Sequence, residues 1–399
     1  MKRAFIYDAI RSPRTKAKAS GGLHELTPTA LLAQLHRSIA ERTHLDPSLV
    51  SEVILGCVTQ YGEQAANVAK TSALLAGWPY SIAGLTVNRF CSSSIDAVSL
   101  AALKVNADQS PALIAGGVEM MSRVPLLADG ARVFADHNFG VEHRMLLMGA
   151  GADLIATRVG ATREDCDEVA FFSHQRALLA QNEKRFSSIV SINTSDGEVT
   201  EDECIRASLT RERLADMPLA FAELGAAGSD DVQLAAFEHL EAISHIHTAA
   251  NSPAMCDAAA VLLVGDDSIQ GRLAVLPKVE IVDSVTCGAE PLEVVSGCVT
   301  ATAEIMRRNG LSTADVDVFE IHEAFAATIV KLMRELDLSL DKVNVNGGCI
   351  ALGHPMGATG AIMVGTAIDE LYRSDGELAV VAASGAAGSG SALLLRRCA

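Results

Sequence analysis

The sequence feature that most constrains the fold of this chain is an internal repeat. About the first 125 and the last 120 residues carry the same series of expected elements in the same order. Each half begins with a short apolar strand, at residues 4–10 and 279–285, and continues with a helical pattern that ends in basic residues, at 29–42 and 292–308. The repeat therefore predicts two copies of one α/β unit.

The repeat continues in two further pairs of segments. LDPSLVSEVILG, which starts at Leu45, matches LSTADVDVFEIH, which starts at Leu311, and both indicate a capped helical turn followed by an apolar strand. VNRFC, which ends at Cys91, matches VNGGC, which ends at Cys349, and each leads into small residues and a long helix. The repeat thus places these two cysteines at corresponding positions.

Strands that alternate with helices predict a mixed but largely parallel sheet in each half, with helices on its faces. Two such sheets, related by a pseudo-twofold axis, would enclose helices rich in small residues. Residues 121–250 interrupt the repeat, contain a helical segment at 164–186 and are expected to bind a ligand, or else to form a lid that stabilises an oligomer. The expected division is therefore an N-terminal half at 1–120, an insertion at 121–250, a return to the N-terminal half at 251–270 and a C-terminal half at 271–399.

Composition narrows the class of protein. The 399 residues exceed the roughly 150 of one typical domain by more than twofold, so at least two cores are expected. The net charge of −17 argues against nucleic-acid and anionic-membrane partners. The uncharged run 378–395 contains ASGAAGSGS at its centre, which predicts a strand, a turn and a second strand rather than a membrane span.

Cysteine usage points to a reducing compartment. The nine cysteines are scattered without a Cys-x-x-Cys pair, and the start of the chain, MKRAFIYDAIRSPR, does not read as a signal peptide, so we expect a cytoplasmic protein. His245 and His247 stand two residues apart without a third ligand nearby, so no metal site is expected.

Cys91 is the first candidate for chemistry. It is expected where a strand meets a helix, and the helix dipole there would lower its pKa and make a nucleophilic thiolate available. The alternative is a buried, inert cysteine. A base would come from His322 in HEAFA or from His354 in GGCIALGHPMGATG, whose glycines let the backbone approach a substrate closely. The alternative for each histidine is a purely structural role.

With the motifs NRFCSSS, GGVEMMS, HEAFA and NGGCIALGHPMGATG, the chain resembles the thiolase superfamily of acetyl-CoA acetyltransferases and 3-ketoacyl-CoA thiolases over essentially its full length. HEAF is the version seen in thiolases similar to the β-subunit of the trifunctional complex of fatty-acid oxidation. The resemblance implies a layered α-β-α-β-α sandwich of two βαβαβ-type halves with an inserted loop domain. It also implies an acyltransferase that works through an acyl-enzyme, by 3-ketoacyl-CoA thiolysis or by Claisen condensation with acetyl-CoA.

The resemblance also implies roles for single residues. Cys91 would carry the acyl group, His354 would take its proton, and His322 with His354 would donate hydrogen bonds to a thioester oxygen. A second oxyanion site would use the backbone N–H groups of Cys91 and Ala386. Glu323 would fix the geometry of a neighbouring catalytic group.

Coenzyme A and acyl-CoA are the substrates that the resemblance implies, with no permanently bound cofactor. Their binding would involve Arg206, Ser252 and Met148 of this chain. The resemblance further implies a homodimer or a homotetramer, with a β-oxidation enzyme as an additional partner.

Ser384 is the main departure from the family pattern. It occupies the place of the second cysteine, the acid/base of the carbon–carbon step, and the loss of such a group costs about 10² to 10⁴ in rate. Ser94 and Pro253 replace a usual glycine and a usual serine. Two alternatives therefore stay open, a weakened paralogue that binds acyl-CoA or supports a partner, and a ketosynthase-like enzyme that decarboxylates a malonyl thioester. If another group moves the proton, Cys349 is the next candidate.

Overall fold

The computed structural model describes residues 2–398. The N-terminal half contains five neighbouring strands. In sheet order they are β1 (Phe5–Arg11), β8 (Cys256–Gly265), β5 (Ala112–Met120), β3 (Glu52–Gly56) and β4 (Ala83–Val87). β8 is antiparallel to β1 and β5, whereas β3 runs parallel to both β5 and β4. A short strand, β2 (Thr15–Lys16), pairs with β8.

The C-terminal half repeats this order. Its strands are β9 (Val279–Gly288), β12 (Ser389–Arg397), β11 (Leu378–Ser384) and β10 (Val318–Ile321). A single bridge between Phe319 and Val343 stands where the N-terminal half has β4. β1 pairs with β9, so the two halves form one continuous mixed sheet. The predicted pair of repeated halves is present, joined edge to edge at these two strands.

Two buried helices, α3 (Ser93–Asn106) and α14 (Thr359–Ser374), lie between the halves and pack on strands of both. Their contact is close because it is built from small residues. A Cβ on Gly360 of α14 would lie 2.4 Å from Cγ1 of Ile95. The Ser94 hydroxyl also accepts a hydrogen bond from the backbone N–H of Ala361 at 2.9 Å.

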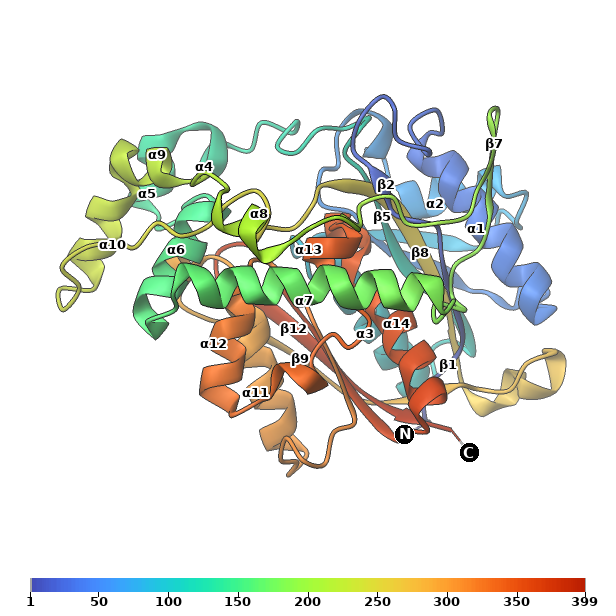
Figure 1. The fold of residues 1–399 in the computed structure, drawn as a ribbon. Helices are drawn as coiled ribbons and strands as arrows, with labels where there is room; N and C mark the ends of the chain where they lie inside the picture. The colour runs from blue at the N-terminus through green and yellow to red at the C-terminus, as the bar shows by residue number, and fades with distance from the viewer. Residues whose placement is uncertain (1, 399) are drawn as a thin grey trace.

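Further helices cover the outer faces. α1 (Pro28–Thr43) and α2 (Val68–Leu75) pack on the N-terminal half, and α11 (Gly297–Arg308) and α12 (Ala326–Leu336) cover the C-terminal half. The order of layers is helix, sheet, helix, sheet, helix (Figure 1). This confirms the α/β fold class predicted from the sequence. The expectation of a largely parallel sheet is wrong, because β8 and β12 are each antiparallel to both of their neighbours.

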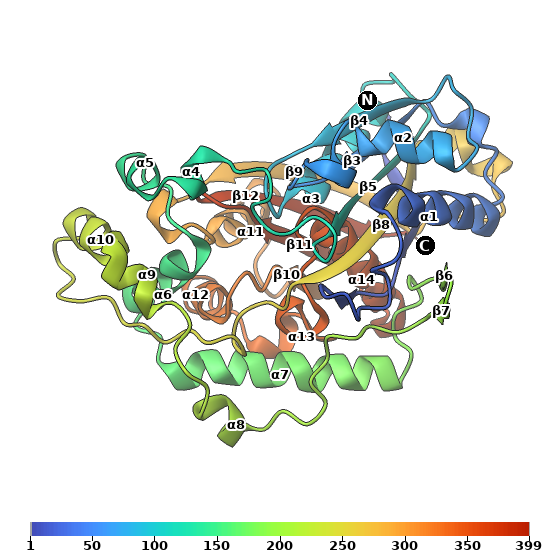
Figure 2. The ribbon, with the colours of Figure 1, turned by 90° about the horizontal axis from the view of Figure 1, so that it is seen from above.

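The insertion forms short elements around one long helix, α7 (Arg163–Asn182), which packs on α12 and on α13 (Cys349–Leu352). Thr162 and Asp165 form a capping box that starts α7. Figure 2 shows α7 and α8 (Arg211–Ala215) along one edge of the molecule, with α1 and α2 on the far side. The remaining elements are α4 (Arg132–Ala135), α5 (His137–Glu142), α6 (Met148–Val159), β6 (Ile192–Thr194), β7 (Gly197–Val199), α8 (Arg211–Ala215), α9 (Ala222–Leu224) and α10 (Asp230–Ala236).

Short 3₁₀-helices and one π-helical segment complete the chain. They are η1 (Pro47–Leu49), η2 (Gly62–Gln64), η3 (Gly225–Ser229), η4 (Asp267–Arg272), η5 (Pro291–Glu293), η6 (Leu340–Lys342) and η7 (Met356–Ala358). Within residues 2–398, no helix combines the length and the apolar character that crossing a membrane requires.

Candidate active site

A cavity of about 410 Å³ opens where the two halves meet the insertion. Cys91, His322 and His354 all reach its wall, so the structure brings together the three residues that the motifs singled out. The rest of the wall is mainly apolar. It consists of Met121, Leu126, Leu127, Leu147, Met148, Gly149, Phe221, Leu224, Ser252, Pro253, Ala254, Met255, Val295, Ala324, Phe325 and Met356.

Cys91 lies in the turn between β4 and α3, half-buried at the N-terminal end of the helix. The turn is tight, because Phe90 has a left-handed φ of 49°. Two side chains support this conformation. The Asn88 carboxamide oxygen accepts a hydrogen bond from the Phe90 N–H at 2.8 Å, and the Ser93 hydroxyl accepts one from the Arg89 N–H at 2.9 Å.

The Cys91 thiol is protonated in this environment. Removal from water raises its pKa to about 12, with a further increase from the Glu119 carboxylate, and its own backbone N–H opposes the shift. The sequence predicted a lowered pKa from the helix dipole, and that prediction is wrong because removal from water, with the Glu119 carboxylate, shifts the pKa in the opposite direction. Cys91 therefore needs a base before it can act as a nucleophile.

His322 follows β10 and is held by its backbone, whose N–H donates to the Ala382 carbonyl at 2.9 Å. The side chain is 1% exposed, and within residues 2–398 neither ring nitrogen has a partner with hydrogen-bond geometry. Burial lowers the pKa of His322 to about 4, although the nearby Ser384 carbonyl partly offsets this. The imidazole is therefore neutral at neutral pH, with both nitrogens free for proton exchange.

His354 lies beside His322, with the ring centroids 4.3 Å apart. Its Nδ1 is 2.8 Å from the Thr359 hydroxyl, so Nε2 remains for the cavity. Burial first, then the neighbouring His322 and Arg14, holds the pKa of His354 well below its usual value. A neutral imidazole can accept a proton, so His354 has the protonation state of a base for the Cys91 thiol.

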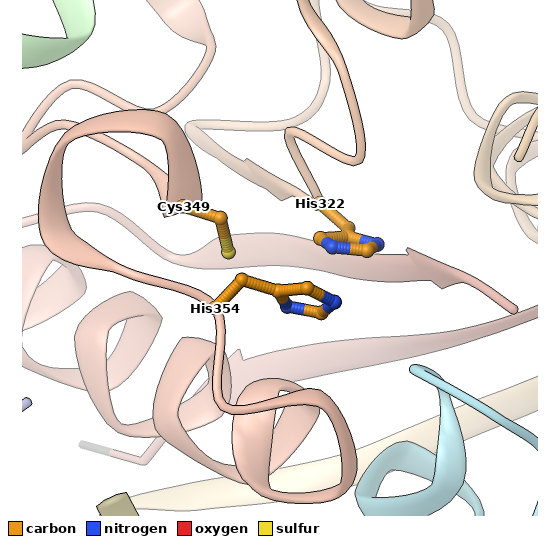
Figure 3. A group of neighbouring side chains, drawn as sticks. All are labelled: His322, Cys349 and His354. Atoms are coloured by element: carbon orange, nitrogen blue, oxygen red, sulfur yellow. The ribbon is translucent and has the colours of Figure 1, made fainter. Parts of the chain in front are cut away.

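Cys349 completes a cluster with the two histidines (Figure 3). Its sulfur and one nitrogen of each imidazole all lie within 4.8 Å of one another.

Ser384 lies at the end of β11, fully buried, and is absent from the residues that line the cavity. Its hydroxyl accepts a hydrogen bond from the backbone N–H of Cys298, at the start of α11, at 2.8 Å. The hydroxyl therefore accepts a hydrogen bond at the start of α11 and does not face the cavity that Cys91 lines.

Comparison with known proteins identifies the family to which this arrangement belongs. Residues 4–232 match the family model of the thiolase N-terminal domain, and residues 275–397 match that of the thiolase C-terminal domain. The chain belongs to the thiolase family. It is a thiolase-type acyltransferase, as the sequence predicted.

Its relatives cover it from end to end. It is 35% identical to the 3-oxoadipyl-CoA/3-oxo-5,6-dehydrosuberyl-CoA thiolase of Escherichia coli K12 and to a 3-ketoacyl-CoA thiolase of Idiomarina loihiensis, with all of each chain covered. The acetyl-CoA acetyltransferase of Bacillus anthracis superposes with a TM-score of 0.84 at 32% identity, over 100% of this chain and 99% of the other.

Ala386 of this thiolase lies in the turn between β11 and β12, and its neighbour Gly385 packs against the segment that precedes Cys91. The contact requires glycine at 385, because a Cβ there would lie 2.7 Å from the Arg89 carbonyl oxygen. The predicted oxyanion pair, the N–H groups of Cys91 and Ala386, thus comes from two adjacent turns.

Glu323 binds one backbone N–H group and two polar side chains rather than a histidine. Its buried carboxylate accepts hydrogen bonds from the Ser173 hydroxyl at 2.7 Å, the Ile350 N–H at 3.0 Å and the Asn344 amide at 3.1 Å. A Cβ on Gly348 would lie 2.2 Å from its carboxyl carbon. Glu323 therefore fixes the loop that carries Cys349 and leads to His354.

The predicted coenzyme residues divide into two groups. Met148 and Ser252 line the same cavity as Cys91. Arg206 is exposed and lines a separate hollow of about 650 Å³ together with Arg213. A weak hydrogen bond of 3.4 Å from Arg206 to the Ala249 carbonyl connects this hollow to the segment that contains Ser252.

His245 and His247 have structural partners. Both bind the carboxylate of Asp153 on α6, at 2.8 Å and 2.6 Å, and His245 also lies 3.0 Å from Asp230. These contacts join the insertion's helices to the segment that returns to β8.

Sequence reasoning gave no role to two further residues at the site. Thr359 orients His354, and the buried Glu119 accepts hydrogen bonds from Val58, Thr59 and Gly357. Glu119 lies within the motif GGVEMMS, which was the available signal. A motif cannot show which distant loops one carboxylate will connect.

Proposed function

We propose that this thiolase cleaves 3-oxoacyl-CoA thioesters by thiolysis, through an acyl group on Cys91. The observation that carries the proposal is the placement of a protonated thiol at a helix N-terminus, in an apolar cavity that it shares with two neutral imidazoles.

In the first half-reaction, Nε2 of His354 takes the Cys91 proton and the thiolate attacks the 3-oxo carbon. The N–H groups of Cys91 and Ala386 stabilise one developing oxyanion, and His322 with His354 donates hydrogen bonds to the thioester oxygen of the departing part. In the second half-reaction, the thiol of coenzyme A attacks the acyl-enzyme and Cys91 recovers its proton from His354.

We assign an apolar acyl chain to the substrate. The cavity wall carries no lysine or arginine, and Leu126, Leu127, Leu147 and Phe221 are among the apolar residues that line it. A 3-oxoadipyl group, for which the E. coli relative is named, ends in a carboxylate. Burial of that carboxylate without a partner would cost several kcal/mol, so binding should favour an uncharged chain.

The insertion would hold coenzyme A, with the phosphates near Arg206 and Arg213 and the thiol arm running past Ser252 and Met148. Two guanidinium groups in one hollow support this placement, because a protein of net charge −17 must attract phosphates locally. Arg206→Ala should raise the Michaelis constant for coenzyme A more than tenfold at low salt, and less at high salt. An unchanged constant at every ionic strength would overturn the assignment.

A steady-state thiolysis assay tests the proposed function. The enzyme should cleave 3-oxooctanoyl-CoA with a kcat/KM at least about 100-fold above that for 3-oxoadipyl-CoA. Equal use of the two substrates would contradict the apolar assignment. Absence of turnover together with tight acyl-CoA binding would support a binding paralogue instead.

The imidazole pair and the position of Ser384 favour one second candidate. Two adjacent histidines without a thiol at residue 384 suit a condensing enzyme that decarboxylates a malonyl thioester. Under that alternative, the acylated enzyme would release carbon dioxide from malonyl-CoA faster than it cleaves 3-oxoacyl-CoA.

We also propose a cytoplasmic homodimer. All nine cysteines are free, which supports a reducing compartment. β4 forms an edge of the sheet, and around it lie exposed apolar side chains, Leu74, Leu75, Tyr80 and Leu85. An open edge strand with apolar neighbours is a natural pairing surface for a second copy. A tetramer and a partner enzyme of β-oxidation remain expectations of the family.

A further inference from the structure

Thiolysis requires a group that protonates carbon. When the bond between the α-carbon and the 3-oxo carbon breaks, the electron pair stays on the acetyl-CoA part, which leaves as an enolate. Ser384 cannot protonate this enolate, because its hydroxyl is fully buried, accepts a hydrogen bond from the Cys298 N–H and does not line the cavity. A serine hydroxyl also does not titrate near neutrality.

The Cys349 thiol lies behind the two imidazoles. It is 2% exposed and does not line the cavity, but its sulfur is within 4.8 Å of a nitrogen of His322 and of a nitrogen of His354. His322 does line the cavity, and neither of its nitrogens has a hydrogen-bond partner in residues 2–398. Figure 3 shows the three side chains close together, Cys349 and His354 from one segment of the chain and His322 from another.

The position of Cys349 is fixed by its neighbours. Glu323 accepts the Ile350 N–H, and the Ser173 hydroxyl accepts the Gly348 N–H at 3.0 Å, so residues on both sides of Cys349 are tied to buried polar groups. Burial also raises the pKa of the Cys349 thiol, so the thiol is protonated at rest and its thiolate, once formed, is a strong base.

We propose that Cys349 stores the proton of the α-carbon step and exchanges it with the substrate through the imidazole of His322. The inference rests on the proposed thiolysis and names the group that completes it.

The proton balance closes over one cycle. As the enolate forms, one nitrogen of His322 gives its proton to the α-carbon, and the other nitrogen takes the proton of the Cys349 thiol, which becomes a thiolate. When coenzyme A attacks the acyl-enzyme, the proton of its thiol returns through the same imidazole to Cys349. The sulfur of coenzyme A forms the new thioester bond, the Cys91 sulfur leaves, and His354 returns the proton that it had taken.

Deuterium exchange separates this role from acylation. The enzyme is incubated with acetyl-CoA in D₂O, and mass spectrometry follows both deuterium in the acetyl methyl group and acetylation of Cys91. In Cys349→Ser and Cys349→Ala, exchange should fall by about 10² to 10⁴, while acetylation stays within about threefold of wild type. Cys166→Ser is the matched control, because Cys166 is also fully buried beside an imidazole, with its sulfur 4.0 Å from His247, and should keep normal exchange.

The outcomes are distinct. Unchanged exchange in Cys349→Ser with normal acetylation would overturn the inference alone. Loss of exchange in Ser384→Ala, with exchange retained in Cys349→Ser, would assign the proton to Ser384 and also overturn it. A wild-type enzyme that never becomes acetylated at Cys91 would overturn the proposed function, and this inference with it. If Cys349→Ala loses its folded circular dichroism spectrum, the exchange rate of the nearly isosteric Cys349→Ser decides whether the inference holds.

Discussion

Thr359 fixes the orientation of the His354 imidazole at the cavity wall. Its hydroxyl is 2.8 Å from Nδ1, so the imidazole is held in one orientation with Nε2 toward the cavity. The group works through His354 and does not touch the substrate in the proposed reaction.

We expect Thr359→Val, which keeps the shape but removes the hydroxyl, to slow acylation of Cys91 about tenfold. Stopped-flow mixing with acetyl-CoA measures this rate. Thr359→Ser should recover most of the activity, and the unfolding free energy of Thr359→Val should fall by only about 1 kcal/mol. Acylation at the wild-type rate in Thr359→Val would contradict the orienting role.

At the residue scale, motifs predicted where the chemistry lies but not how each group is charged. Cys91, His322 and His354 share one cavity, as their motifs indicated. The pKa direction of Cys91 was predicted wrongly, because the apolar walls that raise it come from distant segments. The cluster position of Cys349 depends on which way its side chain points, and a sequence pattern does not contain that information.

At the scale of elements, Glu119 on β5 connects three loops. It accepts hydrogen bonds from the N–H groups of Val58 and Thr59, which follow β3, from the N–H of Gly357 and from the Gln64 side chain. These donors lie in the segment that follows β3 and in the turn that precedes α14. One buried carboxyl group therefore holds these segments together.

Glu119→Gln should lower the unfolding free energy by about 1 to 3 kcal/mol. The NH₂ group of the new amide is a donor, so it cannot accept hydrogen bonds from the backbone N–H groups that the carboxylate binds. Urea unfolding measures the change. Glu63→Gln, which alters an ion pair with Arg123 at the surface, should cost less than about 1 kcal/mol. Equal effects of the two substitutions would contradict the role of Glu119 as an anchor.

His36 joins α1 to α2 and makes their packing sensitive to acid. Its Nε2 lies 3.0 Å from the Ser72 hydroxyl, and its ring centroid lies 4.9 Å from that of Trp78. Burial, with a smaller contribution from Arg37, lowers the pKa of His36 to about 3. The unfolded chain binds this proton more readily, so His36 lowers stability as the pH falls from about 6.5 towards 3.

His36→Gln keeps a hydrogen-bonding side chain and removes the titration. Each pH unit below about 6.5 is worth about 1.4 kcal/mol for one such group, so between pH 7 and pH 5 the variant should lose about 2 kcal/mol less than wild type. Urea unfolding at both pH values provides the comparison. Parallel losses in the two proteins would show that His36 is not neutral in the fold.

Element boundaries followed the sequence where local signals were strong. The helix expected at 164–186 is α7, which a capping box starts. The helix expected at 292–308 begins only at Gly297, because Val294 has a left-handed φ of 55° and ends the preceding turn η5. That kink depends on tertiary contacts, since Gly388 donates a hydrogen bond to the Val294 carbonyl.

At the scale of the whole molecule, the repeat predicted the two α/β halves. The edge strands of each half determine how the halves join and which edge stays open. The matching strand orders of the two halves follow from the repeat. The two halves join where β1 pairs with β9, through only two residue pairs, Phe5 with Glu280 and Ile6 with Val279. No sequence pattern predicted this junction. The other edge of the N-terminal half, β4, is open.

We expect light scattering after gel filtration to give a mass of twice the 41.8 kDa chain. Leu85→Lys, in the middle of β4, should shift the protein towards a monomer, because a charge at an edge strand opposes pairing. Leu179→Lys, at another exposed leucine on α7, should leave the mass unchanged. A dimer that survives Leu85→Lys would place the interface elsewhere.

The central claim is that Cys91 carries the acyl group, and intact-mass analysis with peptide mapping tests it most directly. After mixing with acetyl-CoA or octanoyl-CoA, the protein should gain the mass of one acyl group, located on the peptide that contains Cys91. The gain should vanish in Cys91→Ala and persist in Cys287→Ser, a half-buried cysteine that is not part of the cavity wall. Undiminished labelling of Cys91→Ala, or an acyl group mapped to any other residue, would contradict the account.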